Sequence, residues 1–165
     1  MQEFRVLRMG TVCEDKASRI LGQITLWLMG MSGQITYFLQ PKGLNDEGQP
    51  LSTLHMPVER LIVKDDDFEK VEIPFEILGT EVEDNASGFN GMATGFVCHF
   101  NGCFHVIIQP PGVVEKTGQH IKDADFDLRR CSGEKIPVLT PVEKKESEKK
   151  QPSPTSDRLP EIREG

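Results

Sequence analysis

Residues 10–41 read GTVCEDKASRILGQITLWLMGMSGQITYFLQP, and residues 79–110 read GTEVEDNASGFNGMATGFVCHFNGCFHVIIQP. The two stretches align without a gap at a constant offset of 69 residues, and 11 of their 32 positions are identical. Two unrelated segments of this length would share about two identities. The chain is therefore a tandem duplication of one small module, and duplication favours binding through paired surfaces.

The local pattern of both modules is typical of β-structure. Short runs rich in branched and aromatic residues alternate with clusters of Gly, Asn, Ser and Asp, as in strands joined by turns. We expect an all-β fold with one module over residues 1–64, a charged linker over 65–70 and a second module over 71–136. A module of about 65 residues has only a marginal core, so the two modules should contact each other. Residues 137–165, rich in proline and charge, indicate a disordered tail.

Each module contains a predicted hairpin. Asn101-Gly102 is the strongest short-range hairpin signal, and we expect a two-residue turn there and at Ser32-Gly33. Both faces of these hairpins carry apolar residues, although a hairpin on a small barrel needs only one apolar face. The second face should be covered by the sister module, by another copy of the chain or by a partner. The partner-binding candidates, including two tail residues that resemble a docking motif, are Trp27, Met29, Met31, Phe96, Phe100, Leu159 and Ile162.

Composition excludes several classes of function. The formal net charge is −7, and an acidic body argues against binding to a phosphate backbone. No apolar run is long enough to span a bilayer, and no export signal is visible at the N-terminus. We therefore expect a cytoplasmic protein that binds neither nucleic acid nor membrane. The four cysteines should be reduced thiols.

One candidate ligand cluster lies on the second hairpin. A two-residue turn places Cys98, Cys103 and His105 on one face, and three soft ligands could begin a zinc site. Two half-buried thiols and a satisfied histidine, or a reactive thiol, are the alternatives. No fourth ligand is evident, so we expect no metal and no cofactor. Phosphate-binding glycine loops and HExxH or GxSxG motifs are absent from the sequence, which predicts a non-enzymatic protein.

A turn before each hairpin is repeated as well. Residues 14–18 read EDKAS and residues 83–87 read EDNAS. Asp and Ser in such a stretch accept hydrogen bonds from nearby backbone N–H groups and hold an open turn. The alternative is a carboxylate pair that binds a cation, although its spacing matches no known calcium loop.

The second module carries a recognisable pattern: Gly-Thr-x-x-Glu-Asp-x-x-Ser-Gly-Phe-x-Gly-x-x-Thr, followed by Asn-Gly-Cys and then Gln-Pro. This pattern resembles a family of small uncharacterised proteins common in bacteriophages and prophages. The first module departs from it, with Arg19 and Ile20 in place of Gly-Phe and Gln34 in place of the cysteine. The order of elements is also similar to SH3-like barrels of the KOW and Tudor kind. The resemblance implies two tandem SH3-like small β-barrels and a phage origin, but no activity. If the protein is phage-encoded, the expected location is the cytoplasm of the host cell.

These observations lead to one expected function and two alternatives. We expect a non-enzymatic protein-binding module, made of two SH3-like barrels and a tail, whose partner is a host factor or another phage component. The first alternative is a virion or assembly protein that forms homo-oligomers. The second is a small-ligand or metal-binding protein that uses Cys98, Cys103 and His105 of the second module.

Overall fold

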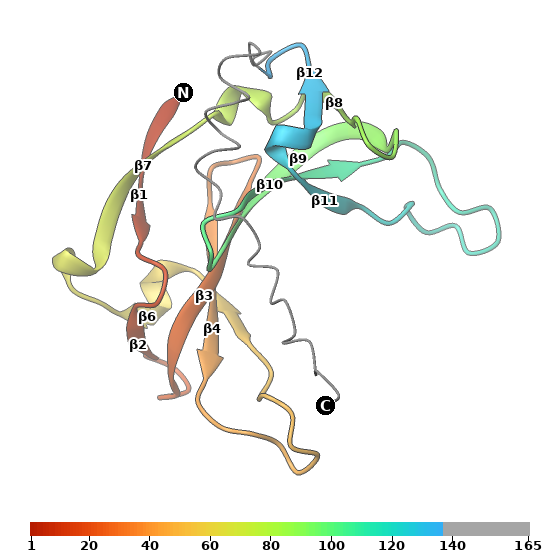
Figure 1. Cartoon of the computed structure of the whole chain (residues 1–165). Helices are drawn as coiled ribbons and strands as arrows, with labels where there is room; N and C mark the ends of the chain where they lie inside the picture. Colours follow the sequence, from red (N-terminus) through yellow and green to blue (C-terminus); the bar gives the residue numbers. More distant parts are fainter. Residues whose placement is uncertain (137–165) are drawn as a thin grey trace, which may run out of the picture.

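A computed structural model of the chain describes residues 1–136 (Figure 1). The predicted tail, with Leu159 and Ile162, lies outside the described residues. The first module contains β2 (Val12–Asp15), β3 (Leu21–Gly30), β4 (Ile35–Pro41), β5 (Leu54–Met56), the 3-10 turn η1 (Val58–Arg60) and β6 (Leu61–Ile62). The second module repeats this order as β8 (Glu81–Asp84), β9 (Asn90–His99), β10 (Phe104–Gln109), β11 (Ala124–Asp127), η4 (Leu128–Arg130) and β12 (Cys131–Gly133).

The all-β prediction is confirmed over the described residues, where the only helical segments are 3-10 turns of three residues. In each module the strands pair in the order β6-β2-β3-β4-β5 or β12-β8-β9-β10-β11. Neither sheet closes on itself, because β5 does not pair with β6 and β11 does not pair with β12. Tandem SH3-like barrels therefore stay a prediction. No helix in residues 1–136 is long and apolar enough to cross a membrane.

Two strand pairs join the modules. The long strands β3 and β9 pair antiparallel, so that the two sheets form one ten-stranded sheet. In a separate two-stranded sheet, β1 (Gln2–Leu7) pairs with β7 (Phe68–Ile73) on the left of Figure 1. Two further 3-10 turns, η2 (Asp65–Asp67) and η3 (Phe75–Ile77), flank β7. The linker predicted at residues 65–70 is thus partly a strand.

The modules are related by a local two-fold axis. Leu28 faces Val97 across the β3–β9 pair, and Glu3 faces Glu72 across the β1–β7 pair; both partners are separated by the repeat offset of 69 residues. The hairpin tips also exchange contacts: a Cβ built on Gly10 would lie 3.7 Å from Phe100, and one built on Gly79 would lie 3.5 Å from Met31. Such reciprocal contacts are the signature of an isologous dimer interface, here within one chain.

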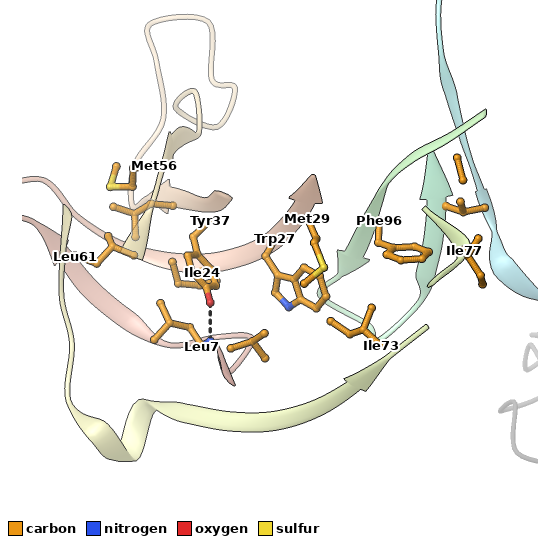
Figure 2. Close-up of a cluster of buried hydrophobic side chains, with 14 of the residues drawn as sticks. Leu7, Ile24, Trp27, Met29, Tyr37, Met56, Leu61, Ile73, Ile77 and Phe96 are labelled. Atoms are coloured by element: carbon orange, nitrogen blue, oxygen red, sulfur yellow. Dashed lines mark hydrogen bonds between the residues drawn. The ribbon is translucent and has the colours of Figure 1, made fainter. Parts of the chain in front are cut away.

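One hydrophobic core runs through both modules. Figure 2 shows its side chains in a continuous row, from Leu7 and Tyr37 in the first module through Trp27 to Phe96 in the second. The Tyr37 hydroxyl accepts a hydrogen bond of 3.0 Å from the backbone N–H of Leu7, so this buried polar group is satisfied. The predicted partner-binding residues Trp27, Met29 and Phe96 are part of this core. They are structural residues and are not available to a partner.

The prediction of two-residue hairpin turns is wrong by one residue. The backbone N–H of His99 donates to the carbonyl of Cys103 at 2.9 Å, which leaves a loop of three residues, 100–102. Gly102 adopts a φ of +84°, the left-handed conformation that closes such a loop. The register therefore shifts: Cys98 faces Phe104, and His105 faces Val97. Because side chains alternate along a strand, this shift moves Cys98 and His105 to opposite faces of the sheet.

The repeated acidic turns are structural. Asp84 is fully buried and accepts hydrogen bonds from the N–H and hydroxyl of Ser87 at 3.0 and 2.5 Å. Arg130 donates two more, at 2.9 and 2.8 Å, and thereby fastens η4 to this turn. Asp15 and Arg60 repeat the arrangement in the first module. The predicted open turn is confirmed, and an arginine occupies the position that a cation would have taken.

Candidate metal centre

The corrected register brings a different set of side chains together. His99 and His105 project from the same face of the β9–β10 hairpin, because His99 is paired with Cys103 and His105 faces Val97. On the neighbouring strand β11, Asp127 faces His105 and Asp125 faces Ile107. Residues 125 and 127 therefore share the face of the two histidines. Two imidazoles and a carboxylate meet on the side of the sheet opposite to the core.

These three side chains lie at distances that suit a metal ion. The Nδ1 atom of His105 is 2.7 Å from Oδ2 of Asp125, and Nε2 of His99 is 3.6 Å from the same oxygen. All three ligand atoms lie within 4.8 Å of one another. Ligands around a tetrahedral zinc ion, each about 2.0–2.1 Å from the metal, are separated by about 3.3 Å. Small side-chain movements would bring the three atoms to that spacing.

His99 carries a polar atom without a partner. Its Nε2 is buried and accepts or donates no hydrogen bond, the sole such side-chain nitrogen or oxygen among residues 1–136. The 3.6 Å separation from Asp125 is too long for a hydrogen bond, and the two imidazole rings meet edge to face at 4.4 Å. A buried nitrogen that lacks a partner costs free energy. A metal ion between the three side chains would supply that partner.

The second module as a whole carries an excess of acidic side chains. Residues 65–136 contain 14 acidic and 6 basic side chains, whereas residues 1–64 contain 6 acidic and 7 basic ones. The nearby Asp127 is already neutralised, because Arg129 donates to both of its carboxylate oxygens at 2.9 and 2.6 Å. These hydrogen bonds lower the pKa of Asp127. Asp125 is thus the carboxylate that faces the two histidines.

Only one member of the predicted cluster belongs to this centre. His105 is a candidate ligand, but Cys98 points to the opposite side, where it contacts the core, and burial raises its pKa. Cys103 shares the outer face with His99, yet its sulfur is not one of the three ligand atoms that lie within 4.8 Å of one another. Sequence reasoning missed His99 because of the one-residue register error. It missed Asp125 because no local signal fixes the pairing of β10 with β11 across the long loop between them.

The centre is confined to the second module. In the first module, Gly30 and Thr36 occupy the positions of His99 and His105 at the repeat offset. The position of Asp125 is occupied by His55, since His55 faces Phe38 as Asp125 faces Ile107. The His55 ring stacks on Phe38 with ring centroids 3.8 Å apart. Among residues 1–136, the two sheets share a backbone arrangement, but only the second provides a group of three candidate metal ligands.

An apolar surface adjoins the centre. Five apolar side chains project from the same outer face, none of them belongs to the core cluster, and none is strongly exposed. We call them the outer strip: Leu26, Leu28, Phe38, Val97 and Ile107. Leu26 faces His99 directly across β3–β9, so the strip begins one strand from the centre. The sister module was expected to cover the second hairpin face. Instead, the two modules join side by side through the β3–β9 strand pair, so that their outer faces form one continuous surface.

Comparison with known proteins provides no assignment. No family model matches the chain, and neither the curated proteins nor the solved structures contain a significant match. The resemblance to a phage family, the protein partner and the absence of catalysis therefore stay predictions. Of the partner-binding candidates in the described residues, Met31 and Phe100 are exposed, by 50% and 55%, at the tips of the two hairpins.

Proposed function

We propose that this protein binds one first-row transition-metal ion, with zinc the best fit, through His99, His105 and Asp125. The observation that carries the proposal is the unpartnered, buried Nε2 of His99 beside two further ligand atoms within 4.8 Å. Imidazole suits zinc, nickel, copper and iron, and two histidines with one carboxylate are a ligand set found at zinc sites. The chemistry proposed is binding, in line with the non-enzymatic character expected from the sequence.

The arrangement explains how each ligand would be held. His99 and His105 lie on paired strands, so their separation is fixed by the hairpin ladder. Asp125 is held by the β10–β11 ladder and already contacts Nδ1 of His105 at 2.7 Å. Because metal binding requires deprotonated imidazoles, the affinity for the metal should fall as the pH decreases through the range in which histidine becomes protonated.

Isothermal titration of the metal-free protein with Zn²⁺ tests the proposal. The wild-type chain should bind one ion. His99→Gln, His105→Gln and Asp125→Asn should each weaken binding by at least about 100-fold, because losing a side chain that binds the metal directly costs at least as much as losing a residue that only orients such a side chain. His55→Gln is the matched control, because His55 occupies the position of Asp125 in the first module, and it should bind as the wild type does. Circular dichroism would show that each variant is folded.

Two results would contradict the proposal. One is a wild-type chain that binds no Zn²⁺, Ni²⁺ or Co²⁺ in a buffer without chelators. The other is unchanged affinity in both His99→Gln and His105→Gln, which would place the bound ion elsewhere on the molecule.

A further inference from the structure

We propose that the loaded metal centre takes a ligand in which an acidic, metal-binding group is attached to an apolar body, and that this body lies on the outer strip. The inference rests on the proposed metal function. It adds the chemical class of the ligand, which a metal site alone does not define.

The coordination of the ion leaves room for such a ligand. The described residues place three ligand atoms around the centre, whereas zinc takes four ligands at least. Sites with three protein ligands keep the fourth position for water or for a bound molecule. Oxygen acids, such as carboxylates and hydroxamates, coordinate zinc readily, and the incoming group would approach from the outer side of the sheet.

The apolar part of the ligand is defined by the neighbours of the two histidines. Leu26 faces His99, and Val97 faces both His105 and Leu28 across adjacent strand pairs. Directly opposed side chains in a sheet have Cβ atoms about 4.5–5.5 Å apart. A ligand that coordinates the metal can therefore place its next carbon atoms on Leu26 and Leu28, which are half-buried, without spanning a polar gap. Val97 lies beside Leu28 in the strand pair and is only 7% exposed, so it offers almost no surface of its own.

On the outer face, the next pair of residues along β3 and β9 after Leu28 and Val97 consists of two glycines. Gly30 faces Gly95 across the β3–β9 pair, so neither strand places a side chain there. A Cβ built on Gly30 would have no heavy atom within 4 Å, which means that the space above this strand is open. The space is open on β3 only, because a Cβ built on Gly95 would lie 2.6 Å from the carbonyl oxygen of Met29 and 3.2 Å from Cδ1 of Ile107. An apolar body can therefore lie along β3, beside Leu28.

Two hydroxamates that differ only in their apolar part test the inference. Acetohydroxamate and hexanohydroxamate present the same chelating group, and their binding to Co²⁺-loaded protein can be followed by the d–d absorption of the ion. We expect hexanohydroxamate to bind at least ten-fold more tightly, which corresponds to the burial of about two methylene groups.

Variants of the outer strip then distinguish the contribution of the apolar surface from that of the metal ion. Leu28→Thr and Leu26→Thr each replace an apolar side chain by threonine, which is also favoured in strands. Each variant should reduce the ten-fold preference for hexanohydroxamate to less than about three-fold, and its affinity for Co²⁺ should not change. Leu21→Thr, which removes an exposed leucine outside the strip, should leave the preference intact.

The outcomes distinguish the two proposals. If the protein binds Co²⁺ but both hydroxamates with equal affinity, the ligand class proposed here is wrong and the metal function stands. If the preference persists in both strip variants, the apolar body lies elsewhere and this inference is overturned. If no Co²⁺ binds at all, the metal function fails and the present inference fails with it.

Discussion

At the scale of single residues, the buried Asp–Arg pairs are the clearest feature that the two modules share. Asp15 and Asp84 hold equivalent turns, and each receives two hydrogen bonds from an arginine that directly precedes the last strand of its module. An aspartate of this kind is ionised in the folded protein and costs free energy to protonate. The pairs therefore link the stability of the fold to pH.

The first prediction concerns this linkage. Hydrogen bonds from Arg130 lower the pKa of Asp84 from 3.8 to about 2, and the pKa of Asp15 is also lowered, chiefly by Arg60. As the pH falls below about 4 the unfolded chain takes up protons before the folded one, so the stability present above that pH is lost progressively towards pH 2. The thermal midpoint of the metal-free protein should decrease steeply between pH 4 and 2.

A matched pair of variants isolates the contribution of Asp84. In Asp84→Asn the midpoint should be lower at neutral pH but should change less between pH 4 and 2 than in the wild type. Asp46→Asn, at an exposed loop position, should retain the wild-type slope. Equal slopes for Asp84→Asn and the wild type would show that Asp84 is not responsible for the acid sensitivity.

At the scale of elements, the long strands β3 and β9 determine what each module can do. Each strand pairs at its start with a strand of its own module and at its end with the other module. Where β9 crosses the end of β10, Gly91 approaches the backbone so closely that a Cβ would lie 2.2 Å from the carbonyl oxygen of Gln109. Gly22 makes the equivalent approach to Gln40 at 2.6 Å.

The second prediction compares two glycines of the same hairpin. Gly102→Ala should lower the free energy of unfolding by about 1–2 kcal/mol, because Gly102 is in the left-handed region and a Cβ there would meet no neighbour. Gly91→Ala should cost more, since the strands must separate to admit the methyl group. Urea denaturation measures both, and a Gly91→Ala protein as stable as the wild type would contradict the close crossing of β9 and β10.

The strands could be predicted from sequence better than the turn between them. Branched and aromatic residues on either side of Ser32-Gly33 and Asn101-Gly102 indicate two hairpins, and the structure has β3 with β4 and β9 with β10 at these places. Asn101-Gly102, however, fits a two-residue turn and equally a three-residue loop that ends in a left-handed glycine. Asn101 contributes to the longer loop by accepting a hydrogen bond of 3.0 Å from the backbone N–H of Cys103. Because the loop is one residue longer than predicted, the side chains of β9 point to the opposite faces from those expected. The candidate site therefore contains His99 and not Cys98.

At the scale of the whole molecule, residues 1–136 form two modules of similar strand order that share one ten-stranded sheet and one core. The repeat offset predicted two similar modules in contact, but it did not indicate which strands would meet. The β3–β9 and β1–β7 pairs depend on contacts between residues far apart in sequence, which local patterns do not encode. Asp125 reaches the histidines in the same way, across the long connection between β10 and β11.

The two modules have similar strand orders but differ in the residues at the candidate site. The second module provides His99, His105 and Asp125 and most of the acidic side chains, whereas the first module has Gly30, Thr36 and His55 at the equivalent positions. The described part of the chain therefore offers a single set of three ligands. This asymmetry is the central claim, and it predicts both the number of ions and the atoms that bind them.

X-ray absorption at the zinc edge of the fully loaded protein, combined with metal analysis, tests that claim most directly. One zinc ion per chain should be found, with nitrogen and oxygen ligands at about 2.0–2.1 Å and the scattering pattern of two imidazole rings. A sulfur ligand at about 2.3 Å would instead assign the metal to the cysteines. Such a result, or two equivalent ions per chain, would contradict the account.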